Sequence, residues 1–257
     1  MPLSFESFDF LYLFFWILVR VSIIFFLMPL FGASGVPALW KAGTSFVISI
    51  VLIPVVPPPE YLPISVPELI LGVACEALVG LILALGIKIL LASVQLAGQF
   101  MSFQMGFSMA RAMDPQTGAQ STVLTQFLYL FTILFFLSID GHHIFIRALA
   151  ASFRLIPPGT FSFNQSISEI LIKASGHMFL IGLKIAAPIM VALFLSNLCL
   201  GIIARTVPQV NILMIGFPIN ISIGLIVFIM IIVNISPLLS KLTRSMGELL
   251  YGLLNLM

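Results

Sequence analysis

Long apolar runs, separated by short clusters of proline, glycine and polar residues, dominate this sequence. The first run covers residues 10–31 and contains a single charge, Arg20. The second, at 42–56, is short for a membrane span, which needs about 20 residues. Because the runs show no strand-like alternation of apolar and polar positions, they predict an all-α protein.

The third run predicts a helix longer than a bilayer requires. Ser65-Val66-Pro67-Glu68 has the spacing of a capping box, with serine at the cap and glutamate three residues later, so a helix should begin there. No proline follows until Pro115, and a helix of about 45 residues would be ~70 Å long. The hydrocarbon core of a bilayer is only ~30 Å thick. The segment must therefore bend, at Gly98 or Gly106, or extend beyond the membrane.

The second half of the chain predicts further helices and a hairpin. A capping box at Ser166-Ile167-Ser168-Glu169 opens an apolar segment, 167–203, in which Pro188 is a potential kink. The polar turn 205–211 separates it from an apolar run at 212–235, so these two helices should form an antiparallel pair. Three other helices are expected at 123–139, 144–155 and 236–257.

The composition restricts the class of protein. The 257 residues are 61% hydrophobic and 8% charged, whereas soluble domains contain about 25% charged residues. So few charges cannot cover a globule in water, which argues against a soluble enzyme, a nucleic-acid binder and a disordered protein. We expect a polytopic membrane protein, or a subunit buried in a membrane-associated assembly. The net charge of +2 is too small to indicate an anionic partner.

Three smaller features complete this expectation. Glu6 and Asp9 stand where a signal peptide would carry positive charge, so the first apolar run should not be cleaved. Cys75 and Cys199 lie in apolar runs and are expected to be reduced packing residues. Lysine and arginine are too few around the runs to fix the orientation in the membrane.

Small residues and two charges recur every four positions along the third run. The set is Gly72, Glu76, Gly80, Ala84, Lys88 and Ala92. On a helix they form one slowly winding ridge that another backbone can approach closely. Glu76 and Lys88 would be ~18 Å apart along the axis, so each needs a partner elsewhere, and Arg20 is a candidate for Glu76. Two interpretations stay open: an ion pair between helices or subunits, and a proton or ion path.

A stripe of methionines follows at the same spacing. Its members are Met101, Met105, Met109 and Met113, with Phe103 and Phe107 spaced alike. Methionine is flexible, so such a surface can repack around different shapes. Asp114-Pro115 then breaks the helix and leads into a polar stretch, 116–122. The stripe is either part of a core helix or a deformable plug in a pore.

The sequence gives little support for catalytic or metal chemistry. His142 and His143 are adjacent and would point about 100° apart on a helix, which predicts no two-ligand metal face. Gly106-Phe107-Ser108-Met109-Ala110 loosely matches a nucleophile turn, so an intramembrane hydrolase using Ser108 is a remote alternative. The sequence has no phosphate-binding glycine loop. We expect no enzyme activity, no cofactor and no metal.

Short motifs follow one another in a definite order along nearly the whole chain. They are Arg20 with Met28-Pro29-Leu30-Phe31-Gly32, Val36-Pro37, Lys41, Glu76, Gly80, Gly98, Asp114-Pro115, Asp140-Gly141-His142-His143, Pro157-Pro158-Gly159, Lys184-Ile185-Ala186-Ala187-Pro188 and residues 201–211. Their order and spacing resemble the export-gate family of flagellar and virulence-type III secretion systems. The Asp-Gly-His-His stretch is closer to the flagellar branch.

The resemblance implies one subunit of a helical export gate in the bacterial inner membrane, within the flagellar basal body. Residues 1–184 would be similar to a FliP subunit and residues 185–257 to a FliQ subunit. The gate would also contain several copies of these two partners and contact further export-apparatus membrane proteins. Unfolded flagellar proteins would pass through its pore, obstructed by a plug at 103–122, and other components would supply the driving energy.

Individual residues receive expected roles from the pattern and the resemblance together. The plug residues are Phe103, Met105, Phe107, Met109, Met113, Asp114 and Pro115. The turn at the cytoplasmic entrance contains Arg205, Pro208, Gln209 and Asn211. The buried charges for assembly are Arg20, Glu76 and Lys88. The structural motif residues are Pro29, Gly32, Gly141 and His142. The main alternative is a secondary transporter for a small solute or ion, in which Arg20, Glu76 and Lys88 would be the coupling groups.

Overall fold

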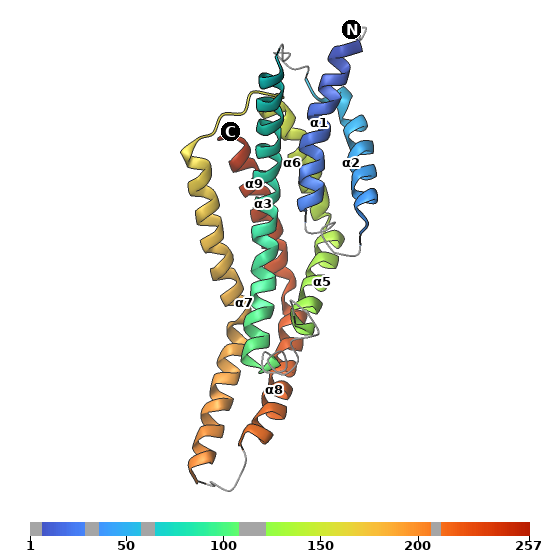
Figure 1. Ribbon diagram of the computed structural model, residues 1–257. Helices are drawn as coiled ribbons and strands as arrows, with labels where there is room; N and C mark the ends of the chain where they lie inside the picture. The colour runs from blue at the N-terminus through green and yellow to red at the C-terminus, as the bar shows by residue number, and fades with distance from the viewer. Residues whose placement is uncertain (1–6, 29–35, 58–64, 108–121, 207–211) are drawn as a thin grey trace. The chain divides into compact units, whose positions relative to one another are not determined.

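The computed structural model describes residues 7–28, 36–57, 65–107, 122–206 and 212–257, and the elements in these parts are all helical (Figure 1). The elements are α1 (Ser7–Leu27), α2 (Ala38–Leu52), the 3₁₀ turn η1 (Ile53–Val55), α3 (Val66–Gln104), α5 (Val123–Ser138), α6 (Gly141–Leu155), α7 (Gln165–Thr206), α8 (Ile212–Asn234) and α9 (Ser236–Leu254). The prediction of an all-α protein is confirmed.

Five of these helices are long and apolar enough to cross a membrane, or six spans if α5 and α6 together form one broken span. The five are α1, α2 with η1, α3, α7 and α8. Helices α3 and α7 have 39 and 42 residues, which correspond to ~58 Å and ~63 Å. Both exceed the ~30 Å of a hydrocarbon core, so the expectation of overlong helices in a polytopic protein is confirmed.

The ends of α3 follow from its sequence. The helix begins at Val66, directly after Ser65, as the capping-box spacing predicts. It ends at Gln104, just before Gly106, whose φ of 89° is a conformation that residues with a side chain rarely adopt. Gly98 lies inside the continuous helix, where a Cβ would approach the Cα of Thr125 to 2.8 Å. Gly106 therefore terminates α3, and Gly98 lets α5 approach closely.

The start of α7 differs from the predicted capping box. The helix begins at Gln165, and the side chain of Asn164 accepts a hydrogen bond from the backbone N–H of Ser166 at 3.1 Å. The Ser168 hydroxyl instead donates to the carbonyl of Gln165 at 2.6 Å. Asparagine is as good a cap as serine, so the helix starts two residues before the expected Ile167.

The chain folds into two compact units, each assembled from separate stretches. Unit 1 contains residues 1–90, 140–174 and 243–257, and unit 2 contains residues 91–139 and 175–242. Helices α3 and α7 each contribute to both units. The boundary at 184/185 that the resemblance implies lies inside α7, so the compact units divide the chain differently. The division into a FliP-like and a FliQ-like part stays a prediction.

Candidate functional site

A buried ion pair between α1 and α3 is the strongest polar feature of unit 1. The Nε of Arg20 donates to Oε2 of Glu76 at 2.6 Å, and both side chains are fully buried. Their positions are 56 residues apart in the sequence. Arg20 is thus the partner that the sequence named as a candidate for Glu76, and the interpretation as an ion pair between helices is the one that the structure supports.

Helix α6 and the residue that caps its C-terminal end supply the remaining contacts of the guanidinium group. Its Nη1 donates to the Ser152 hydroxyl and its Nη2 to the carbonyl of Ile156, both at 3.1 Å. The Phe153 ring lies against the flat face of the group, with its centroid 4.3 Å from Cζ, a favourable cation–π contact. Ser152 in turn donates to the carbonyl of Leu149 at 2.7 Å. The Nε, Nη1 and Nη2 atoms of Arg20 therefore each donate a hydrogen bond to an acceptor.

The second carboxylate oxygen of Glu76 is also paired. Oε1 accepts the backbone N–H of Gly159 at 3.0 Å. Gly159 has a φ of 83°, and no atom lies within 4 Å of the place where its Cβ would stand. The backbone conformation, not a lack of space, therefore favours glycine there. The conformation directs this N–H at the carboxylate, so both charges of the cluster are compensated.

Close packing of α1 on α3 holds the pair in place. A Cβ on Gly72 would stand 1.7 Å from the ring of Trp16, and one on Gly80 would stand 3.0 Å from the carbonyl oxygen of Arg20. Gly72, Glu76, Gly80 and Ala84 are all buried. The predicted ridge of small residues therefore faces α1 from Gly72 to Gly80, where it allows the α1 backbone to approach.

Lys88 does not belong to this cluster, and its expected role as a buried charge in the assembly stays a prediction. Its side chain is exposed. A step of four residues turns a helix by about 40° beyond a full rotation, so the three steps from Glu76 to Lys88 add up to about 120°. The ridge has then rotated away from the face that carries Glu76, which leaves the ammonium group outside the cluster.

The methionine stripe divides into a buried part and a part outside the described residues. Met101 and Met105 are fully buried in the core of unit 2, where Gly224 of α8 faces the Met105 side chain. Phe103 is 70% exposed and Phe107 is half-buried. The other expected plug residues, Met109, Met113, Asp114 and Pro115, lie outside the described residues. Met101 and Met105 thus fit the interpretation as a core helix, and the plug stays a prediction.

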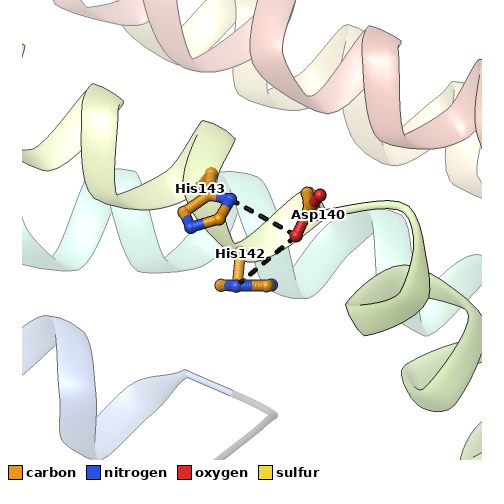
Figure 2. A group of neighbouring side chains, drawn as sticks. All are labelled: Asp140, His142 and His143. Carbon is orange, nitrogen blue, oxygen red and sulfur yellow. Dashed lines mark ion pairs between the residues drawn. The ribbon is translucent and has the colours of Figure 1, made fainter.

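The Asp140-Gly141-His142-His143 motif forms a compact group of side chains (Figure 2). Oδ1 of Asp140 lies 3.4 Å from Nδ1 of His143 and 4.0 Å from Nε2 of His142. The centroids of the two imidazole rings are 4.3 Å apart. The prediction that the two rings point apart is wrong, because it considered only the direction of each side chain. Nδ1 of His143, which is close to the backbone, and Nε2 of His142, which is farther from it, lie near the same carboxylate oxygen of Asp140.

The remaining expected residues are only partly described. Gly141 is buried, and Arg205 is exposed at the end of α7. Five further residues lie outside the described residues: Pro29 and Gly32 of the first motif, and Pro208, Gln209 and Asn211 of the turn after α7. Their expected roles stay predictions.

Polar contacts join α7 to α8 at positions that no sequence pattern had indicated. The Asn220 amide donates to Oδ1 of Asn197 at 2.7 Å and accepts from the Ser196 hydroxyl at 2.9 Å. These contacts join the two helices that were expected to form a hairpin. Ser152 was not predicted either, although a serine among the apolar positions of an amphipathic helix is a signal for a buried polar partner.

Comparison with known proteins places most of the chain within one family. The model of the family described as "Bacterial export proteins, family 1" matches residues 11–246. The chain is 39% identical to the flagellar biosynthetic protein FliR of Bacillus subtilis (strain 168) over 223 residues, 86% of this chain and 85% of that protein. It is 32% identical to the FliR of Pectobacterium carotovorum over 94% of this chain and 92% of that protein. It is 30% identical to the FliR of Escherichia coli (strain K12) over 95% and 93% of the two chains.

Proposed function

Because the chain belongs to the bacterial export proteins of family 1, we propose that it forms part of the pore through which unfolded flagellar proteins cross the inner membrane. It is a non-enzymatic component of the flagellar export apparatus and a multi-pass membrane protein. The observation that carries the proposal is the extent of the similarity, which spans most of both chains. The function therefore concerns the whole chain and not one segment of it.

The exposed apolar surface of the helices supports a role inside an assembly. In the most apolar 18-residue stretches of the helices, only 17% of the stretch is buried in α2 with η1 and 17% in α8, compared with 61% in α3. Apolar surfaces of this extent are covered by lipid or by other proteins. Since α3 and α7 are longer than a bilayer is thick, lipid alone does not cover them. FliP-like and FliQ-like subunits are the partners that we propose for these surfaces.

The plug that we propose at 103–122 would begin and end at anchored positions in unit 2. The hydroxyl groups of Ser102 and Thr122 lie 2.5 Å apart, so the residue before the segment and the last residue of the segment are held together. Thr122 Oγ1 also accepts the backbone N–H of Thr125 at 3.3 Å and caps α5. On the other side, Met101 and Met105 fix the end of α3 in the core.

We assign the Arg20–Glu76 pair to the assembly of the gate, not to proton coupling. A coupling group must exchange protons or ions with water or substrate during transport. Both side chains are fully buried and hydrogen-bonded. The alternative, a secondary transporter, would need these groups to become accessible, and no described contact supplies a route to them.

Native mass spectrometry after gentle detergent extraction from the native membrane tests the proposal. We expect one copy of the tagged chain together with several copies of two small hydrophobic proteins. A chain that runs alone, or as a homodimer, under conditions that preserve other membrane complexes would contradict the proposal and favour the transporter.

A further inference from the structure

The start of α6 brings one carboxylate and two imidazoles together outside the Arg20–Glu76 cluster. One ligand atom from each of Asp140, His142 and His143 lies within 4.8 Å of the other two (Figure 2). Within the part of the chain that the structure describes, this is the group whose side chains could together hold a metal ion. All three side chains are at least partly accessible to solvent, so an ion could reach them.

The backbone of Asp140 has an unusual conformation for its position. Its φ of 58° makes it the one described residue other than glycine with a positive φ. This left-handed conformation is uncommon for residues with a side chain, and aspartate is among those that adopt it most readily, here at the turn between α5 and α6.

The carboxylate of Asp140 is also used in an unusual way. An aspartate at a helix N-cap ordinarily accepts a hydrogen bond from a backbone N–H of the first turn. Asp140 occupies the N-cap of α6, yet the structure records no such bond from its side chain. The carboxylate is turned toward the two imidazoles instead.

The distances within the group fit a small transition-metal ion. Two ligands bound ~2.1 Å from a tetrahedral ion are about 3.4 Å apart, which matches the 3.4 Å between Asp140 Oδ1 and His143 Nδ1. The 4.0 Å to His142 Nε2 requires only a small side-chain rotation. The other nitrogen of His142, Nδ1, is buried without a hydrogen-bond partner among the described residues. The polar environment of this ring is therefore incomplete in the isolated chain.

We propose that Asp140, His142 and His143 bind one divalent transition-metal ion of the Zn²⁺ type. Two imidazoles and one carboxylate form a donor set that suits Zn²⁺ and leaves a fourth position for water or a partner's side chain. The negative charge of Asp140 offsets the positive end of the α6 dipole, which would otherwise oppose a cation. The ion would hold the first turn of α6 against the residue that precedes it.

A titration of the tag-free, full-length chain in detergent with Co²⁺ tests the site, with visible absorption as the readout and Zn²⁺ as the competitor. We expect one equivalent of Co²⁺ to produce the intense absorption of a low-coordinate site, and Zn²⁺ to displace it. His143→Gln and Asp140→Asn should each weaken binding at least about tenfold, which is the loss that even outer-shell substitutions cause. Asparagine also tolerates the positive φ at position 140.

His177→Gln is the matched control, because His177 is an exposed histidine of α7 outside the group. It should leave the Co²⁺ affinity unchanged, and far-ultraviolet circular dichroism should show the same helix content in every variant. Absorption that never exceeds that of weakly bound aqueous Co²⁺, or an equal loss of affinity in His177→Gln, would overturn the proposal. The three side chains would then be a local ion-pair network and not a metal site.

Discussion

Replacing Glu76 by glutamine should lower the stability of the protein far more than neutralising a charge outside the Arg20–Glu76 pair. The glutamine side chain keeps the shape of glutamate but removes the charge opposite Arg20. It also offers only one acceptor oxygen where two are used, because Oε2 faces Arg20 and Oε1 faces the N–H of Gly159. Whichever way the amide is turned, a donor faces a donor. The variant therefore loses one hydrogen bond and leaves a buried guanidinium group without its counter-charge.

Breaking a buried pair in this way costs about 3–5 kcal/mol. The whole free energy of unfolding of a typical domain is about 5–15 kcal/mol, so a large share of it would be lost. We expect unit 1 of Glu76→Gln to pack incompletely, and the variant to be recovered with its partners in much lower yield. Lys88→Gln is the control on the same helix. Because its ammonium group is exposed, the change should lie within about 0.5 kcal/mol.

Two measurements compare each variant with the wild type: the amount of intact complex on native gels, and the thermal unfolding of the purified chain in detergent. A double variant, Arg20→Leu with Glu76→Leu, separates the pair from its single charges. Since apolar replacement of a whole buried pair is often tolerated, it should recover part of the stability that either single change removes. A Glu76→Gln variant that unfolds like the wild type, assembles in normal yield and loses only proton-coupled export would refute a role of the pair in assembly. The pair would then be a coupling group.

Three further changes test other parts of the account. Gly72→Ala places a Cβ 1.7 Å from the Trp16 ring and should lower the free energy of unfolding by about 1–3 kcal/mol, measured by thermal unfolding. Gly43→Ala is the control, because open space surrounds Gly43, and it should not lower the stability. Equal effects of the two changes would contradict close packing of α1 on α3. Deleting 106–118 should make the assembled gate leak ions in a membrane-potential assay, and an ion-tight deletion would exclude the plug. Asn220→Ala removes the amide that joins α7 to α8 and should cost about 0.6–2 kcal/mol, seen as faster proteolysis of the hairpin; unchanged proteolysis would mean that apolar packing alone holds it.

The sequence predicts the helices well because length and apolarity alone decide them. The run after Ser65 is apolar and free of proline, and the first residue that strongly favours a helix end is Gly106, where α3 does stop. The predicted ridge also holds where it meets α1. It fails at Lys88 because a four-residue period drifts around the helix by about 40° per step, so a sequence ridge and a contact face coincide for only about two turns.

The residues that hydrogen-bond to the Arg20–Glu76 pair could not be predicted from the sequence. Ser152 and Gly159 are separated from the residues they contact by 132 and 83 positions. No periodicity connects such positions, since only the packing of α6 beside α1 and α3 brings them together. The prediction that the His142 and His143 rings point apart failed for a local reason. Helical spacing describes where a side chain leaves the backbone, but not how far each of its nitrogen atoms extends.

The Arg20–Glu76 cluster makes correct packing of unit 1 an all-or-none condition. The guanidinium group needs α3 for its counter-charge and α6 for two further acceptors, while the carboxylate needs the N–H of Gly159 after α6. If any of these elements is misplaced, at least one charged group stays buried without a partner, which is far more costly than a lost apolar contact. Apolar helices alone discriminate weakly between alternative packings, because an apolar helix face packs almost equally well against several different apolar faces. A charged centre that three elements must satisfy together therefore selects one arrangement among them, and an exposed apolar surface is presented to partner subunits only from that arrangement.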